Sequence, residues 1–315
     1  MANVTDSVFR RLFAKYGRPD VTWTEFVSAD GLISSGKKRL LIDLEFKAKE
    51  RPIVAQLFTG HPDAMKKAAT LASRLKFDGL DINMGCPDRS VEKQGGGASM
   101  IKQPKMALEV LEAARAGFKG PVSVKTRLGY NVVDLEWIRL LLRQNLPALT
   151  VHLRTRKEMS EVPAHWELMP KIVAMRDEIQ ASMKPTDRTL IIGNGDVDSI
   201  SDAVKKCRDT NCDGAMIGRG IFGKPWFFEN VKISRDAKEK TPEERLKILL
   251  EHARAFDKAF CGRKRLKSFS VMKKHFKAYV SGWDGAKELR AKLMETDDFT
   301  STKKVIGDYL LANKP

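Results

Sequence analysis

Short runs of β-branched and other apolar residues alternate with longer amphipathic stretches along most of this sequence. The predicted strands lie at residues 20–25, 52–57, 79–83, 121–125, 148–152, 190–194 and 214–218. The predicted helices between them lie at residues 62–75, 104–116, 135–144, 166–175 and 199–208. This alternation predicts βαβ units, and therefore an α/β fold with a parallel sheet that is buried on both faces.

The number of predicted strands favours a closed barrel over an open sheet. A helix-like segment at residues 6–16 precedes the first of the seven strands, so an eighth strand is expected just before Met1. An eight-stranded βα (TIM) barrel over residues 1–236, with its first strand truncated, accounts for this pattern. A barrel that lacked one strand would expose two unpaired edges, so we expect the natural chain to extend upstream of Met1.

A second region begins where the strand pattern stops. Residues 237–315 are predicted to form a C-terminal all-helical domain, with helices at 241–260, 269–280, 285–296 and 301–313. Thr241 is a typical N-cap residue, and Pro242 suits the first helical position that follows it.

The chain is strongly basic, with 57 Lys and Arg against 40 Asp and Glu, a formal net charge of +17. Such a surface attracts polyanions, and in the cytoplasm these are mostly nucleic acids. The segment 263–277 holds basic residues without one acid, namely Arg263, Lys264, Arg265, Lys267, Lys273, Lys274 and Lys277. This run predicts contacts with several phosphates, and a solvated helix face is the alternative.

Polar residues follow the apolar runs of six predicted strands, where the chemistry of a βα barrel collects. They are Gln56, Asn83, Lys125, His152, Asn194 and the pair Gly218-Arg219. Each one taken alone could be a strand end that simply reaches water. Together they predict a polar site at the carboxyl ends of the strands.

Two of these strand ends are rich in glycine. Gly195 follows Asn194 and precedes Asp196, and Gly218 precedes Arg219. Glycines let main-chain N–H groups approach an anion closely, so these two loops predict a phosphate site. Ordinary turns are the alternative.

Cys86 lies between Gly85 and Pro87 on the loop after the strand at 79–83. This place is the mouth of the predicted barrel. The glycines at 95–97 are expected to make a pliant loop beyond it. Taken alone, a cysteine flanked by Gly and Pro is structural more often than reactive.

These motifs resemble those of the tRNA-dihydrouridine synthase family, and the similarity runs nearly end to end. The most specific part is Asn83-Met84-Gly85-Cys86-Pro87, followed by Lys125 and a basic helical tail. The other similar segments are residues 1–10, 24–25, 55–57, 151–156, 193–196, 217–220, 272–275 and 285–290.

The resemblance implies FMN at the mouth of the barrel and NADPH as the reductant. It implies that the reaction reduces the C5–C6 double bond of particular uridines in tRNA. Cys86 would be the catalytic acid. The cofactor would be bound by Met1, Gln56, Lys125, His152, Asn194, Gly195, Asp196, Gly218 and Arg219. The RNA substrate would be bound by Asn83, Arg154, Arg263, Arg265, Lys273 and Lys274.

Two other functions fit the same residues. One is an FMN-dependent barrel oxidoreductase that acts on a free small molecule, and the other is an RNA-binding relative that has lost catalysis. Neither a metal site nor a membrane segment is expected, because Cys207 and Cys212 lack a second Cys/His pair and no apolar run is long enough. Four cysteines in this length do not suggest a disulfide framework, so we expect a cytoplasmic protein. We also expect the protein to be monomeric.

Overall fold

A computed structural model describes residues 3–262 and 266–313 of the chain. The chain divides into two compact units. The sheet unit consists of Asp20–Glu45 and Arg51–Arg219, and the helical unit of Met1–Pro19, Phe46–Glu50 and Gly220–Pro315. The predicted domain boundary between residues 236 and 237 stays a prediction.

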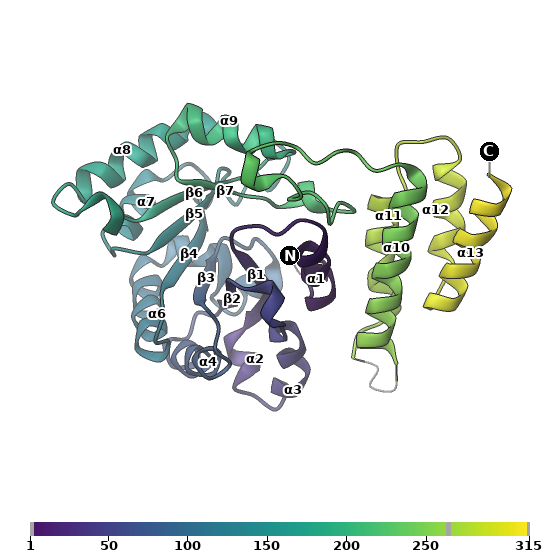
Figure 1. Cartoon of the computed structure of the whole chain (residues 1–315). Helices are drawn as coiled ribbons and strands as arrows, with labels where there is room; N and C mark the ends of the chain where they lie inside the picture. The colour runs from purple at the N-terminus through teal and green to yellow at the C-terminus, as the bar shows by residue number, and fades with distance from the viewer. Residues whose placement is uncertain (1–2, 263–265, 314–315) are drawn as a thin grey trace. The chain divides into compact units, whose positions relative to one another are not determined.

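The sheet unit contains a parallel sheet in which every strand pairs with the next strand along the chain. Its strands are β1 (Thr22–Ser28), β2 (Ile53–Phe58), β3 (Gly79–Met84), β4 (Val122–Arg127), β5 (Ala148–His152), β6 (Leu190–Asn194) and β7 (Gly214–Met216). The sheet curls, and helices cover its outer side (Figure 1). All seven predicted strands are therefore confirmed, in a curled parallel sheet. The eighth strand and barrel closure stay predictions.

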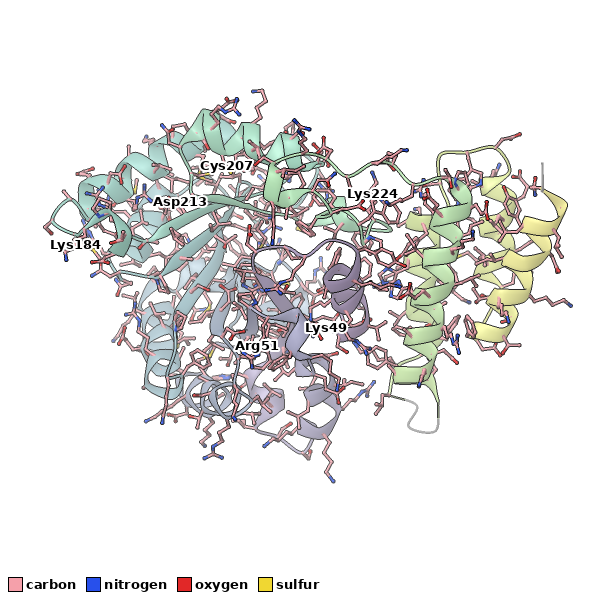
Figure 2. The ribbon with its side chains drawn as sticks, in the orientation of Figure 1. Lys49, Arg51, Lys184, Cys207, Asp213 and Lys224 are labelled. Carbon is pink, nitrogen blue, oxygen red and sulfur yellow. The ribbon has the colours of Figure 1, made fainter. Side chains whose placement is uncertain are left out.

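The α-helices of the sheet unit lie between its strands along the chain. They are α2 (Ala29–Leu32), α3 (Lys37–Leu40), α4 (Pro62–Arg74), α5 (Arg89–Glu92), α6 (Pro104–Gly117), α7 (Leu135–Leu142), α8 (Met169–Ile179) and α9 (Ile200–Thr210). Between α4 and α6 the backbones approach so closely that a Cβ on Gly117 would lie 2.3 Å from the carbonyl oxygen of Lys66. This packing covers β3, whose six residues are all buried. The outer surface is charged, and Lys184 extends into solvent between α8 and β6 (Figure 2).

The helical unit contains the helices predicted near both ends of the chain. They are α1 (Ser7–Tyr16), α10 (Pro242–Phe256), α11 (Met272–Tyr279), α12 (Ala286–Met294) and α13 (Phe299–Ala312). The predicted cap of α10 is confirmed, because the Thr241 side chain accepts from Glu244 N–H and the Glu244 carboxylate accepts from Thr241 N–H. Phe9 of α1 packs on the buried rings of His252 and His275.

None of the helices within residues 3–262 and 266–313 is both long and apolar enough to cross a membrane.

Candidate active site

The carboxyl ends of the strands bring the predicted polar residues to one edge of the sheet. Asn83 of β3 lies opposite Lys125 of β4, and His152 of β5 lies opposite Asn194 of β6. Arg127, two residues beyond Lys125, lies opposite His152. The parallel register therefore assembles one continuous polar edge.

Cys86 is half-buried at this edge, on a loop that is held from two sides. Its main-chain N–H donates to Asn83 Oδ1 at 2.9 Å, and its carbonyl oxygen accepts from Ala98 N–H at 2.9 Å. Gly97 has a φ of +61°, and a Cβ there would lie 2.5 Å from the Cys86 carbonyl oxygen. The glycines at 95–97 are thus required for close backbone approach, a reason that the expectation of a pliant loop did not include.

Burial raises the pKa of the Cys86 thiol above its ordinary value. A main-chain hydrogen bond from Asp88 and the charges of Arg127 and Lys125 oppose this rise without cancelling it. The thiol is therefore protonated at neutral pH, as a proton donor must be.

Gln56 and Asn83 bind each other. Asn83 Nδ2 donates to Gln56 Oε1 at 3.1 Å, and Gln56 Nε2 donates to Asp81 Oδ2 at 2.7 Å. The Ser123 hydroxyl donates to the other carboxylate oxygen of Asp81 at 2.6 Å. Asp81 lies two residues before the motif Asn83–Pro87, and nothing in the sequence marked it as part of the site.

Three cationic or basic side chains lie along the edge beyond Asn83. Burial, followed by the charge of Arg127, lowers the pKa of Lys125 to about 8. Burial and the neighbouring charges of Lys125, Arg127 and Arg154 lower the pKa of His152 to about 2, so the imidazole is neutral. The Lys125 ammonium makes no hydrogen bond to any residue that the structure describes. The site is thus rich in positive charge. No carboxylate among the described residues lies at hydrogen-bonding distance from the Lys125 ammonium.

Arg127 is a site residue that the sequence did not reveal. Its guanidinium is buried and donates to the main-chain oxygens of Gly85 at 2.8 Å, Thr155 at 2.9 Å and Met159 at 3.0 Å. It therefore fastens the Cys86 loop to the loop after β5. Only its position two residues beyond Lys125, on the same face of the strand, could have drawn attention to it.

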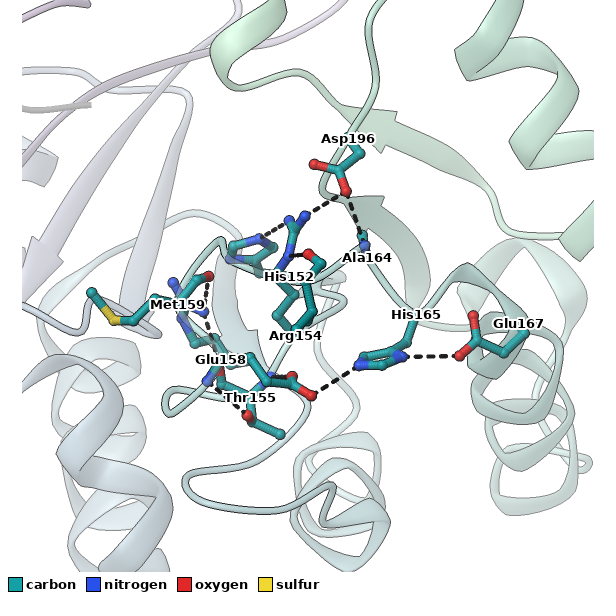
Figure 3. Close-up of polar contacts among 11 residues, drawn as sticks. His152, Arg154, Thr155, Glu158, Met159, Ala164, His165, Glu167 and Asp196 are labelled. Carbon is teal, nitrogen blue, oxygen red and sulfur yellow. Dashed lines mark hydrogen bonds and ion pairs between the residues drawn. The ribbon is translucent and has the colours of Figure 1, made fainter.

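Asp196 joins the loops after β5, β6 and β7. Figure 3 shows its contacts with Arg154 and Ala164 in the loop after β5. Its carboxylate pairs with the guanidinium groups of Arg154 and Arg219 and accepts from Ala164 N–H at 2.9 Å. Arg154 also donates to the Val162 carbonyl oxygen at 2.6 Å. Arg154 is only 2% exposed, and its part as an RNA contact stays a prediction.

His152 has a fixed tautomer because Arg154 approaches its Nε2 at 3.2 Å. A guanidinium has no acceptor, so Nε2 of the neutral ring accepts and Nδ1 carries the proton. His152 therefore presents an N–H donor on its other side.

The two glycine-containing loops have main-chain donors to spare. Four main-chain N–H groups donate no hydrogen bond to any described residue, namely those of Gly195, Asp196, Gly218 and Arg219. The nearest atom to a Cβ built on Gly218 would be Asn194 Nδ2, at 4.0 Å. This is open space beside unpartnered N–H groups, and it fits an anion such as a phosphate.

The loop after β5 also holds a histidine between two carboxylates. His165 lies between the carboxylates of Glu158 and Glu167, each 3.0 Å from a ring nitrogen (Figure 3). These hydrogen bonds, led by the one to Glu158, raise the pKa of His165. Glu158 also accepts from Thr155 N–H at 2.7 Å, which closes the loop on itself.

The remaining predicted residues lie elsewhere. Met1, Arg263 and Arg265 are outside the residues that the structure describes. Lys273 and Lys274 lie on α11 of the helical unit, where Lys273 pairs with Asp297 at 3.4 Å and Lys274 is exposed. Their contact with RNA stays a prediction. No cluster of His, Cys, Asp and Glu among the described residues could hold a metal ion.

The sequence of this chain is similar to a known protein family. The sequence model of the family described as "Dihydrouridine synthase (Dus)" matches residues 1–313. A "Probable tRNA-dihydrouridine synthase 2" of Bacillus subtilis is 39% identical over 312 residues, which cover 98% of this chain and 92% of that protein. A "Probable tRNA-dihydrouridine synthase" of Staphylococcus aureus strain COL is 36% identical over 98% of this chain and 91% of its own length.

Among solved structures, a histamine dehydrogenase from Rhizobium sp. 4-9 is similar with a TM-score of 0.48 and 10% identity. The similarity covers 99% of this chain and 61% of that chain, and a score this low carries no inference about function. The family match covers almost the whole sequence, and the two relatives exceed 35% identity over nearly their full length. The chain belongs to the dihydrouridine synthase family.

Proposed function

We propose that this chain is an FMN-dependent tRNA-dihydrouridine synthase that reduces the C5–C6 double bond of uridine in tRNA. The observation that carries the proposal is Cys86, a half-buried and protonated thiol on the same sheet edge as Lys125, whose ammonium has no hydrogen-bond partner among the described residues. The names of the relatives support tRNA as the substrate.

The residues at the edge fit FMN. The unpartnered N–H groups of Gly195, Asp196, Gly218 and Arg219, with the Arg219 guanidinium, suit its phosphate. We assign its ring system to Gln56, Lys125 and His152, and place Asn194 next to the phosphate. When bound and reduced by NADPH, FMN supplies the hydride that uracil accepts at C6.

Cys86 supplies the proton. Reduction of the double bond adds a hydride at C6 and a proton at C5, so an acid must stand near C5 of the uracil. The raised pKa keeps the proton on Sγ until charge develops on the ring, and a depressed pKa would hinder this role.

Lys125 and His152 stabilise negative charge. The Lys125 ammonium stays largely protonated at neutral pH, since its pKa is about 8. His152 is neutral and donates from Nδ1. A fixed cation and a fixed N–H in a partly buried site stabilise developing charge more strongly than water does.

The RNA must be held while one base leaves its stack. A uridine inside folded tRNA reaches Cys86 only if it is flipped out, and this requires a grip on the surrounding phosphates. The net charge of +17 suits that grip, and we assign part of it to Lys273, Lys274, Arg263 and Arg265. We assign Asn83, which adjoins Cys86, and Arg154 to the side that faces the flipped nucleotide.

The test is dihydrouridine formation in tRNA that lacks it. Purified protein with FMN and NADPH is expected to produce dihydrouridine, detected by mass spectrometry of digested nucleosides. Cys86→Ala is expected to retain flavin and tRNA binding but to lose at least about 100-fold in rate, as is typical when a catalytic acid is removed.

Cys207→Ala is the matched control, because it removes a half-buried thiol on α9 away from this edge. Its rate should equal that of the wild type. Full activity of Cys86→Ala would refute the acid assignment. Absence of dihydrouridine with the wild-type protein would refute the function.

A further inference from the structure

Asp81 is a buried carboxylate in the middle of β3 that the chemistry above does not use. It is 1% exposed, and its two oxygens accept from Gln56 and Ser123. We propose that Asp81 is a positioning residue that fixes the Cys86 loop through the side-chain amides of Gln56 and Asn83. The inference deepens the proposed function and rests on it for its catalytic consequence.

The first step is the orientation of Gln56. An ionised carboxylate only accepts hydrogen bonds, so the Gln56 amide must turn its nitrogen toward Asp81. The 2.7 Å bond from Gln56 Nε2 to Asp81 Oδ2 has this direction. The amide oxygen of Gln56 then necessarily faces the opposite way.

The second step is the orientation of Asn83. Gln56 Oε1 accepts from Asn83 Nδ2 at 3.1 Å, which turns Asn83 Oδ1 toward the loop. Asn83 Oδ1 accepts from the N–H groups of Gly85 at 3.1 Å and Cys86 at 2.9 Å. A reversed Asn83 would place an NH₂ group against these two donors. Asp81, Gln56 and Asn83 thus form a relay of hydrogen bonds that ends at the Cys86 N–H. Because Asp81 can only accept, it sets which group donates and which accepts in every bond of the relay.

The third step is the charge on Asp81. Burial raises the pKa of Asp81 to about 6, and the bonds from Ser123 and Gln56 and the charge of Lys125 oppose a larger rise. The carboxylate is therefore mostly ionised above pH 7. Hydrogen bonds to an ionised acceptor are roughly twice as strong as neutral ones, so the relay is firmest in this state.

Arg127 holds the same turn from its other side. It donates to the Gly85 carbonyl oxygen at 2.8 Å, while Asn83 accepts from the Gly85 N–H. Loss of the relay therefore leaves Arg127 as a partial anchor, so the fold should survive while the Cys86 N–H becomes freer to exchange.

Amide hydrogen exchange of Gly85 and Cys86 tests the relay directly. It is measured on the purified wild-type protein without RNA and on Asp81→Asn, whose side chain can offer NH₂ as well as oxygen. We expect exchange at these two amides to quicken about tenfold in Asp81→Asn, since a charge-assisted anchor is lost.

Asp78→Asn is the matched control. Asp78 precedes the same strand at its other end, where its carboxylate accepts from the main-chain N–H of Ile53 at 2.7 Å. This variant should leave exchange at Gly85 and Cys86 unchanged. Unchanged exchange in Asp81→Asn, or equal effects of both variants, would overturn the proposal.

A double-mutant cycle shows whether Asp81 acts through Asn83. In an Asn83→Ala background, Asp81→Asn should add nothing to the exchange rate of Cys86, because the relay is already broken. In the presence of Asn83, kcat for dihydrouridine formation should fall about tenfold with KM for tRNA unchanged. Additive effects of the two substitutions would exclude the relay.

Gln56→Met guards against misfolding of the Asp81 variant. It breaks the relay in the middle and leaves Asp81 bonded to Ser123. The same acceleration of exchange is expected, and a wild-type rate would refute the relay. Exchange is independent of turnover, so a wild-type protein that made no dihydrouridine would overturn the proposed function and leave this result standing.

Discussion

Two polar networks flank the sheet edge, and they are built from different chemistry. The network at β2–β4 contains one carboxylate, Asp81. Two neutral side-chain amides link this carboxylate to the Cys86 N–H through hydrogen bonds that all have a fixed donor and acceptor. The network at β5–β7 is built from charges, in which Asp196 pairs with Arg154 and Arg219.

The difference matches what each network would hold. Neutral amides can fix a loop without adding charge beside a thiol that must keep its proton. Paired charges that leave main-chain N–H groups unused suit a bound anion instead. We infer that the first network serves the proton donor and the second serves the phosphate.

The largest effect expected from this comparison is a pH-dependent change in stability caused by Asp81. Its pKa rises from 3.8 to about 6 on folding, so the folded state binds the proton more tightly than the unfolded state. Stability therefore falls as pH rises through this window, by up to about 3 kcal/mol, and is constant above it.

Urea unfolding of the wild type and Asp81→Asn at pH 4.5 and pH 7 measures this change. The stability of the wild type relative to the variant should fall between the two pH values. Groups common to both proteins cancel in that difference. If the difference in stability between the wild type and Asp81→Asn does not depend on pH, folding does not raise the pKa of Asp81, and burial does not penalise its ionised form.

The next largest effect concerns the second network, at Gly218. Nothing crowds a Cβ there, so Gly218→Ala should unfold at the wild-type temperature. The added methyl group would occupy the proposed phosphate position, so FMN affinity should fall at least about tenfold. Fluorescence titration of the protein with FMN measures it.

Gly36→Ala is the control, because a Cβ at Gly36 would meet only Ser34 Oγ at 3.4 Å. It should bind FMN as the wild type does. If Gly218→Ala binds FMN with wild-type affinity, the phosphate does not bind at this loop, and the second network does not serve it.

Much of the fold could be predicted from the spacing of apolar residues along the sequence. The strands at 148–152 and 190–194 have the predicted bounds, because an apolar run and a polar end define each one. The strand predicted at 214–218 is shorter, and ends at Met216 where the glycine loop begins. At this strand the hydrophobic pattern predicts the start, while the glycine turn sets the end; elsewhere the predicted bounds differ from the observed ones by up to three residues.

The site was only partly predictable. Asn83 and Lys125 could be found because polar residues at strand ends are conspicuous. Asp81 and Arg127 could not, since their partners lie on neighbouring strands and on the loop after β5. Arg154 was predicted to contact RNA, and its bond to Asp196 depends on how that loop folds back. Such pairings depend on register and loop path, which period does not encode.

The smallest effect is expected at His165, which locks the loop after β5 beside the second network. Its pKa is raised, chiefly by the hydrogen bond to Glu158, so its stabilising contribution is full below the ordinary pKa of 6.5 and is lost as pH rises through the raised value. Thermal unfolding of the wild type and His165→Gln should therefore differ most at pH 6 and converge toward pH 8.5. A rise from pH 7 to pH 8.5 should leave amide exchange at Cys86 unaltered relative to its intrinsic rate, because Asp81 is mostly ionised throughout that range. A parallel change at Cys86 would mean that the two networks are coupled, through the Arg127 bonds that join their loops.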